Sequence, residues 1–404
     1  MAEAEAVATD ARGWLHLAHA RWAAGDRPGA REAAAEAVAS SPDNAELVLT
    51  LAHFDLNIGD LVRAGEGFRA ALALDATLAG AWSGAAEVAF LAGSVDTAVE
   101  AARRAVALSP GEGRPALRLG QFLIAGGGDP VEAEAALRAA FSFGEGGAHP
   151  HLTLAEALLR QDRRAEALAE AMRAHEEAPE DAGIRQRHAE FQIACGGDVA
   201  LAERELRALV EAGGASIGAM AGLGDALWRL GRDAEAIAAL EATIEAFPEM
   251  GFPHERLGHL LVAMGGDAVR AEAAFRAAIA FPGAPEHLFI GLAEALKRQD
   301  RAGDAYQVLQ EAAALFPHSY AAPWTLGLLI LEADDGVLAE AEACFIQVMA
   351  RRPGHGDAHL GLAEVYRRQK RIKDAVAEFR SGAALGPTPG LLRVIRFRLY
   401  GVMD

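Results

Sequence analysis

Residues 220–248 read MAGLGDALWRLGRDAEAIAALEATIEAFP, and this stretch decides the fold. Small and apolar residues recur at i, i+3, i+4 and i+7 on both sides of Gly231, which is the pattern of two amphipathic helices. Gly231 ends the first helix, and Pro248 stops the second. A lone pair of helices cannot bury its apolar face, so the pattern predicts similar pairs stacked on both sides.

The same spacing returns along nearly the whole chain with a period of about 34 residues. Copies begin near residues 11, 45, 79, 113, 148, 182, 217, 251, 286, 320 and 356, which makes about 11 repeats over residues 11–389. Three clear copies are Trp14, Leu17, Ala18, Gly25, Ala30, Ala37 and Pro42; Trp82, Ala85, Ala86, Gly93, Ala98, Ala105 and Pro110; and His359, Leu362, Ala363, Tyr366, Ala375, Phe379 and Pro387. This pattern resembles the tetratricopeptide repeat, W-x2-L-G-x2-Y followed by A-x3-F, A and P. The resemblance implies an all-α, right-handed superhelical solenoid of helix hairpins that ends in a C-terminal capping helix.

A second, longer period predicts three parts of the chain. From residue 113 onward, long turns rich in glycine or acidic residues alternate with short basic turns. The equivalent turn residues Asp162, Gly231, Asp300 and Lys370 follow one another at steps of 69, 69 and 70 residues. We therefore expect about three repeats in 1–112, eight repeats arranged as four double repeats in 113–389, and a basic, apolar C-terminal helix in 390–404. Duplication of a repeat pair explains this pattern without any selection for function.

Composition excludes several classes of protein. Of the 404 residues, 52% are hydrophobic and 24% are charged, so the chain is not of the disordered kind. The net charge of −19 argues against nucleic acid as a partner, because phosphates repel such a surface. The N-terminus lacks the pattern of a signal peptide, and no stretch of 18 apolar residues exists. We expect a cytoplasmic protein, bacterial by its arginine-, alanine- and glycine-rich composition, whose membrane contact is at most peripheral.

Motifs for catalysis, cofactors and metals are absent from the sequence. It contains neither a phosphate-binding G-x-x-x-x-G-K-[ST] loop nor a dinucleotide-binding fingerprint. Cys195 and Cys344 form no metal or redox motif. The histidine pairs lack a marked third ligand; they are His16 with His19, His149 with His151, and His355 with His359. We therefore expect no cofactor, no metal and no enzymatic activity.

The resemblance also implies a concave groove lined by the first helix of each repeat. In the repeats with short turns, an acid at position 9 precedes an arginine at position 13: Glu156 and Arg160, Asp225 and Arg229, Glu294 and Arg298, and Glu364 and Arg368. One interpretation is a row of stabilising surface ion pairs, because residues four apart are neighbours on a helix. The other is a ladder that binds an extended polypeptide, with arginine donating forked hydrogen bonds.

Further groove candidates are apolar or aromatic side chains. Trp228, Trp324 and His259 fall at or near groove positions, as do Trp22 and Phe90. Tryptophan at a junction between repeats also serves as core, so both interpretations stay open. Asparagine occurs only at Asn44 and Asn57, which excludes the lysine and asparagine clamp of chaperone-binding relatives and the asparagine ladder of sugar-transferase relatives.

The C-terminal end differs in charge from the rest of the chain. Residues 350–404 hold 11 basic and five acidic side chains, which makes them +6, whereas residues 1–349 total −25. After Pro389, one side of the expected helix carries Leu392, Ile395 and Leu399. A cap on the last repeat explains such a helix. The alternative is a docking surface for a partner, a second copy or an anionic membrane, with Arg393, Arg396, Phe397 and Tyr400 as the candidate residues.

Taken together, these patterns predict a non-catalytic scaffold or adaptor that binds polypeptide partners in its groove. One alternative is the substrate-recognition subunit of a separately encoded glycosyl-, sulfo- or methyltransferase. Another is an architectural protein that assembles with further copies of itself through its C-terminal segment.

Overall fold

The computed structural model describes residues 10–213, 216–333 and 337–400, except for the side chains of Leu392, Arg396, Phe397 and Tyr400. Throughout these ranges the chain forms helices joined by short turns, without any strand. The all-α prediction is therefore confirmed. No helix in the described ranges is long and apolar enough to cross a membrane.

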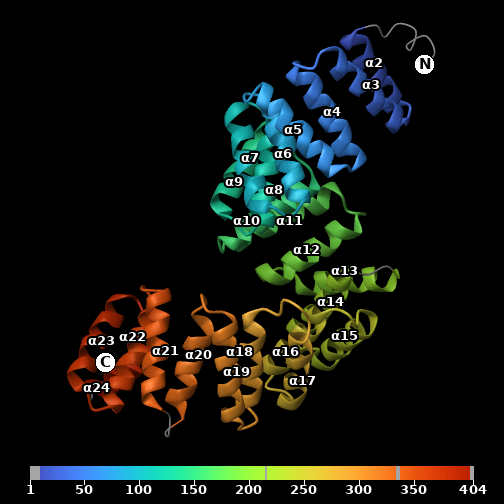
Figure 1. Ribbon diagram of the computed structural model, residues 1–404. Coiled ribbons are helices and arrows are strands. Elements are labelled where there is room, and N and C mark those ends of the chain that lie inside the picture. The colour runs from blue at the N-terminus through green and yellow to red at the C-terminus, as the bar shows by residue number, and fades with distance from the viewer. Residues whose placement is uncertain (1–9, 214–215, 334–336, 401–404) are drawn as a thin grey trace. The chain divides into compact units, whose positions relative to one another are not determined.

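The chain divides into two compact units, Met1–Leu209 and Val210–Asp404, which are described separately (Figure 1). The helices that begin in the first unit are α2 (Ala11–Ala23), α3 (Arg27–Ser40), α4 (Ala45–Ile58), α5 (Leu61–Leu74), α6 (Ala79–Leu91), α7 (Val95–Leu108), α8 (Gly113–Ala125), α9 (Pro130–Ser142), α10 (Ala148–Arg160), α11 (Arg164–Glu177), α12 (Ala182–Cys195) and α13 (Val199–Glu211). Those of the second unit are α14 (Ile217–Arg229), α15 (Asp233–Ala246), α16 (Gly251–Ala263), α17 (Ala268–Ile279), α18 (Glu286–Lys297), α19 (Ala302–Leu315), α20 (Ala321–Glu332), α21 (Leu338–Arg351), α22 (Gly356–Arg368), α23 (Ile372–Ala384) and α24 (Pro389–Tyr400).

Helices alternate between two roles in each unit. The even-numbered helices α2 to α22 are the first helices of the repeats, and the odd-numbered helices α3 to α23 are the second helices. In the first unit, α8 packs against α9 of its own repeat, α7 of the preceding repeat, and the first helices α6 and α10. The same arrangement recurs from α14 to α22 in the second unit. Neighbouring first helices therefore form a row within each unit, as the resemblance to tetratricopeptide repeats implied.

Repeat spacing located the start of the first helices. Ten of the eleven begin at the residue expected from the spacing, and α20 begins one residue later, at Ala321. Side-chain caps help to set these starts, because a helix leaves its first N–H groups without backbone partners. Asn44 Oδ1, for example, accepts the N–H of Glu46 at 3.1 Å, and Asp181 Oδ1 accepts the N–H of Ile184 at 2.9 Å.

The turns at the ends of four first helices share one backbone conformation. Asp162, Gly231, Asp300 and Lys370 have φ angles of 58°, 71°, 57° and 62°. Three of these residues are not glycine, although left-handed φ angles disfavour residues with a Cβ. These are the positions that the double-repeat pattern makes equivalent. The division into 1–112, 113–389 and 390–404 stays a prediction, and part of the long turn expected in the tenth repeat lies outside the described residues.

Close approach of the helices depends on small residues that face large ones. A Cβ added at Gly224 would lie 2.8 Å from Cγ of Leu240, and one at Gly258 would lie 3.0 Å from Cδ1 of Phe275. Both glycines stand at position 8 of their repeats, and both large side chains are fully buried on the second helices. The alanine-rich composition thus lets helix backbones pack closely around a few large side chains.

Candidate functional site on the first helices

A cavity of the first unit lies along its first helices. It has a volume of about 610 Å3 and is lined mainly by α4, α6 and α8. Within it, Arg118 forms a 3.1 Å ion pair with Glu87, whereas Arg114 is exposed and has no hydrogen bond or ion pair in the described residues. Desolvation of the ring, together with the positive charge of Arg114, lowers the pKa of His53. The cavity therefore combines a neutral imidazole with an arginine that is free to bind an acceptor.

A second cavity of about 340 Å3 continues along α2 and α4. Its aromatic wall is formed by Trp22 and Phe54, whose ring centroids lie 5.1 Å apart. The guanidinium of Arg27 lies 5.4 Å from the centroid of the Trp22 ring, a distance that permits a cation–π interaction. Asn57 lines both cavities, so the polar and aromatic surfaces adjoin each other along α4.

Three of the four acid and arginine pairs form ion pairs within their own helix. The distances are 3.1 Å for Glu156 with Arg160, 3.0 Å for Glu294 with Arg298, and 3.0 Å for Glu364 with Arg368. These contacts are those that the i, i+4 spacing indicates. Their arginines are thus already engaged within the chain, which limits what they can offer to a ligand.

The pair on α14 is different. Asp225 lies 3.0 Å from Arg256 of the next first helix, α16, instead of binding Arg229. Arg229 is exposed and has no hydrogen bond or ion pair in the described residues. The half-buried Trp228 precedes it on the same helix, and nothing in the described ranges accepts its indole N–H. Arg229 of the predicted ladder and the predicted aromatic anchor Trp228 therefore have donors that no described residue uses.

Glu364 is buried, in contrast to the exposed groove position that the repeat pattern implied. Its side chain is 2% exposed and accepts hydrogen bonds from Arg367, Arg368 and Arg398. Burial alone would raise the pKa of Glu364, but the hydrogen bonds from these arginines outweigh burial and lower the pKa. The carboxylate is thus a charged centre that joins α22 to α24.

Two of the predicted aromatic anchors, Trp324 and Phe90, pack against other rings of the chain. The Trp324 ring lies 5.7 Å from that of Phe345 and 4.8 Å from that of His355. Phe90 stacks on Phe122 with centroids 4.6 Å apart. Near Trp324, a cavity of about 220 Å3 is lined by α18, α19 and α20 and includes the predicted groove residue Glu294.

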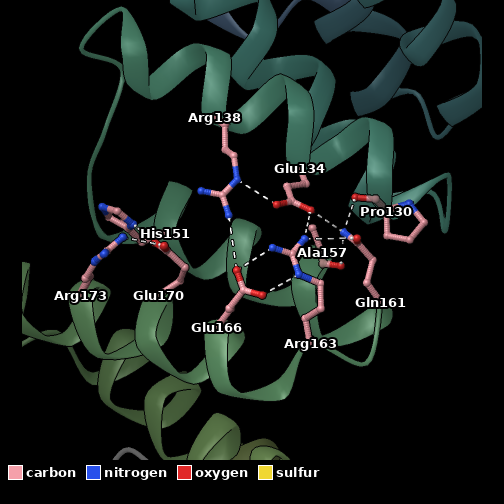
Figure 2. Close-up of polar contacts among 10 residues, drawn as sticks. All are labelled: Pro130, Glu134, Arg138, His151, Ala157, Gln161, Arg163, Glu166, Glu170 and Arg173. Atoms are coloured by element: carbon pink, nitrogen blue, oxygen red, sulfur yellow. Dashed lines mark hydrogen bonds and ion pairs between the residues drawn. The ribbon is translucent and has the colours of Figure 1, made fainter.

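A polar network that sequence reasoning missed occupies three of the four short basic turns, and Figure 2 shows the first of them. The Gln161 amide donates to Glu134 of the preceding repeat at 2.9 Å, and Arg163 donates to the same carboxylate. Arg163 also binds Glu166, at 2.6 Å. The network recurs at Gln299, Glu272, Arg301 and Asp304, and again at Gln369, Glu342, Arg371 and Asp374. The recurring Q-x-R in these turns is the signal that identifies it, and its role is to join consecutive repeats.

Helix α24 packs on the last hairpin. Ile395 is 2% exposed, within a cluster that includes Leu360 and Phe379, and Leu391 and Leu399 pack against that cluster. Among the predicted docking residues, Arg393 is exposed, while the side chains of Arg396, Phe397 and Tyr400 lie outside the described residues. The docking role of all four residues stays a prediction.

Two histidine clusters also come together, although the sequence marked neither. One consists of His175, His188 and Glu205, on α11, α12 and α13. The other consists of Glu255, His259 and His287, on α16 and α18, and includes the predicted groove residue His259. No local sequence motif marks either cluster, because each joins residues of different helices.

Comparisons with known proteins give one family match and several similar structures. The tetratricopeptide repeat family model matches residues 196–250 and 330–388. No curated protein matches the sequence. Among solved structures, the chain is similar to TTC0263, a thermophilic tetratricopeptide repeat protein of Thermus thermophilus, at 25% identity over 45% of this chain and 99% of that one, with a TM-score of 0.36. It is also similar to YrrB, at 19% identity over 46% of this chain and 95% of that one, with a TM-score of 0.38. A third similar structure is Cut9–Hcn1, at 14% identity over 96% of this chain and 89% of that one, with a TM-score of 0.41.

The two matched ranges and the row of helix hairpins give the same identification. The chain contains tetratricopeptide repeats in residues 196–250 and 330–388, and the same arrangement of helix hairpins extends through the described residues.

Proposed function

We propose that this protein is a non-catalytic scaffold that binds polypeptide partners along the first helices of its units. Solenoid repeats expose extended surfaces, and tetratricopeptide repeats serve protein interaction in general. The observation that carries the proposal is the cavity of about 610 Å3 along α4, α6 and α8. An extended polypeptide presents backbone carbonyls and acidic side chains, and the free guanidinium of Arg114 can donate to both.

The second unit contributes a further contact region on α14 and on α18 to α20. Arg229 and Trp228 have unused donors. The wall of the cavity of about 220 Å3 includes Glu294 and Lys297, which form an ion pair with each other at 3.4 Å. Five other predicted groove residues already make contacts within the chain, so a polypeptide must compete with those contacts to bind them. They are Glu156, Arg160, Arg298, Trp324 and Arg368. The proposal places the protein in a bacterial cytoplasm and gives it no cofactor.

A defined peptide ligand tests this proposal. Peptides are selected from a displayed random library on the full chain, and their affinities are then measured by fluorescence anisotropy. Arg114→Glu should lower the affinity for the selected peptides at least tenfold. The matched control is Arg104→Glu on the second helix α7, since Arg104 is also exposed and without a partner in the described residues. Equal affinities for the wild type and both variants would contradict binding in this cavity.

A further inference from the structure

Three side chains of neighbouring first helices converge on one point of the second unit. Glu255 and His259 lie one turn apart on α16, and His287 lies near the start of α18. One potential ligand atom from each residue lies within 4.8 Å of the other two. Glu255 Oε1 is 3.0 Å from His287 Nε2, and the ring centroids of His259 and His287 are 5.8 Å apart.

Internal packing does not account for this cluster. The side chain of His287 is 51% exposed, so its contact with Glu255 contributes little to stability. His259 is also exposed, and its ring nitrogens make no hydrogen bond in the described residues. Its ring meets Phe275 edge to face, with centroids 5.0 Å apart, which orients the imidazole on its helix.

The charges around the cluster suit a cation. Glu255 supplies a carboxylate, and the guanidinium of Arg256 is balanced by Asp225, which lies 3.0 Å away. The cluster therefore presents its carboxylate and imidazole atoms to a cation without an unbalanced arginine beside them.

We propose that Glu255, His259 and His287 bind one divalent transition-metal ion, with Zn2+ as the fitting ion. Two imidazoles and one carboxylate form a ligand set that zinc accepts, with a fourth position left open for water. Bond lengths of about 2.0–2.2 Å place tetrahedral ligand atoms about 3.3 Å apart. The 3.0 Å contact between Glu255 and His287 is close to that separation, and His287, at 51% exposed, has room to turn toward the other two side chains. The fourth position can also take a donor atom of a bound polypeptide, which is the one part of this inference that rests on the proposed function.

In the other histidine cluster, His188 is held by a hydrogen-bond network, whereas Nδ1 of His175 is buried without a partner among the described residues. The Asp198 N–H donates to Gln192 Oε1 at 2.9 Å, so the amide nitrogen of Gln192 donates to His188 Nε2, 3.0 Å away. The proton of His188 therefore lies on Nδ1 and is donated to Glu205 Oε2 at 3.1 Å. A metal at this point would break the bonds of a side chain that is only 4% exposed.

Calorimetric titration of the full chain, without a histidine tag, by zinc chloride tests the proposal. We expect one strong site per chain that weakens at least tenfold in His259→Ala and in His287→Ala, because loss of even an outer-shell partner costs about 10–100-fold. Glu255→Gln should weaken it as well. The matched control is His254→Ala, also on α16 but outside the cluster, which should leave the affinity unchanged.

Circular dichroism of each variant shows whether the helices are intact, and X-ray absorption of the zinc-loaded wild type identifies its ligands. Two imidazoles with oxygen ligands support the site. The proposal is overturned if 1 mM zinc gives no binding, if His259→Ala and His287→Ala bind as the wild type does, or if His175→Ala alone removes the site. None of these results depends on whether the groove binds polypeptides.

Discussion

Glu364 offers a sharp test of how the end of the second unit is held together. Its carboxylate is 2% exposed and accepts from Arg367, Arg368 and Arg398, the last of which belongs to α24. Glu364→Gln keeps the shape of the side chain but removes its charge. It also replaces one acceptor oxygen by an amide group that faces arginines.

The expected cost follows from these contacts. A hydrogen bond to a charged group contributes about 1.5–3 kcal/mol, and removing one partner of a buried ion pair costs about 3–5 kcal/mol. The arginine side chains are 22–44% exposed, so water can solvate them after the change, and one glutamine oxygen still accepts. We therefore expect Glu364→Gln to destabilise the second unit by about 2–3 kcal/mol. Glu294→Gln is the matched control, because Glu294 holds the same repeat position but is 37% exposed, and it should cost less than about 1 kcal/mol.

Urea unfolding followed by circular dichroism measures both variants, and hydrogen exchange locates the effect. Amide protons of α24 should exchange faster in Glu364→Gln, because loss of the charge weakens the contact with Arg398. Equal destabilisation by the two variants, or unchanged exchange in α24, would refute the reasoning.

Acidity provides an independent check on the same carboxylate. The folded protein lowers the pKa of Glu364, so its charge contributes stability that is present above the pKa of the unfolded chain. This contribution is lost as the pH falls through the lower pKa of the folded state. The difference in stability between wild type and Glu364→Gln should therefore shrink on acidification, and a difference that grows would contradict the assignment.

Three further predictions concern binding, packing and association. Arg229→Ala should weaken the binding of a polypeptide to α14, as measured by anisotropy. It should leave the free energy of unfolding within about 0.5 kcal/mol of the wild-type value, as measured by urea unfolding. Gly84→Ala should destabilise the first unit by about 1–3 kcal/mol, because the new Cβ would lie 2.2 Å from Phe68 Cε1; unchanged urea unfolding would contradict this. If the C-terminal segment associates with a second copy, sedimentation should show larger species in dilute buffer, and Val394→Asp, at a side chain 46% exposed, should remove them. A monomer at low and high salt would leave α24 as a cap.

The period of the sequence predicted the backbone well, because it reflects local physics. Amphipathic spacing locates the helix starts and the small residues at position 8, and limits on φ locate turn residues such as Asp162. Each of these features can be found from neighbouring residues in the chain. The left-handed turns at Asp300 and Lys370 were likewise located by counting residues from Gly231.

Side-chain partners were harder to predict, because they join residues of different repeats. The burial of Glu364 depends on Arg398 of the last helix, and the repeat pattern treated Glu364 as equivalent to the exposed Glu294. The cluster of Glu255, His259 and His287 spans two first helices, so no spacing within one helix marks it. The sequence also drew attention to the recurring arginines of the second half, whereas the cavity of about 610 Å3 is lined by α4, α6 and α8, where no charged pair repeats.

Position-specific photo-crosslinking tests the central claim, that polypeptides bind along the first helices. A photoreactive amino acid is placed at Ser83, which lines the cavity of about 610 Å3, and at Glu66, which is exposed on the second helix α5. The account predicts that irradiation of living cells gives discrete polypeptide adducts from Ser83, that these are lost with Arg114→Glu, and that Glu66 gives none of them. Identical adducts from both positions, or none from Ser83, would contradict it.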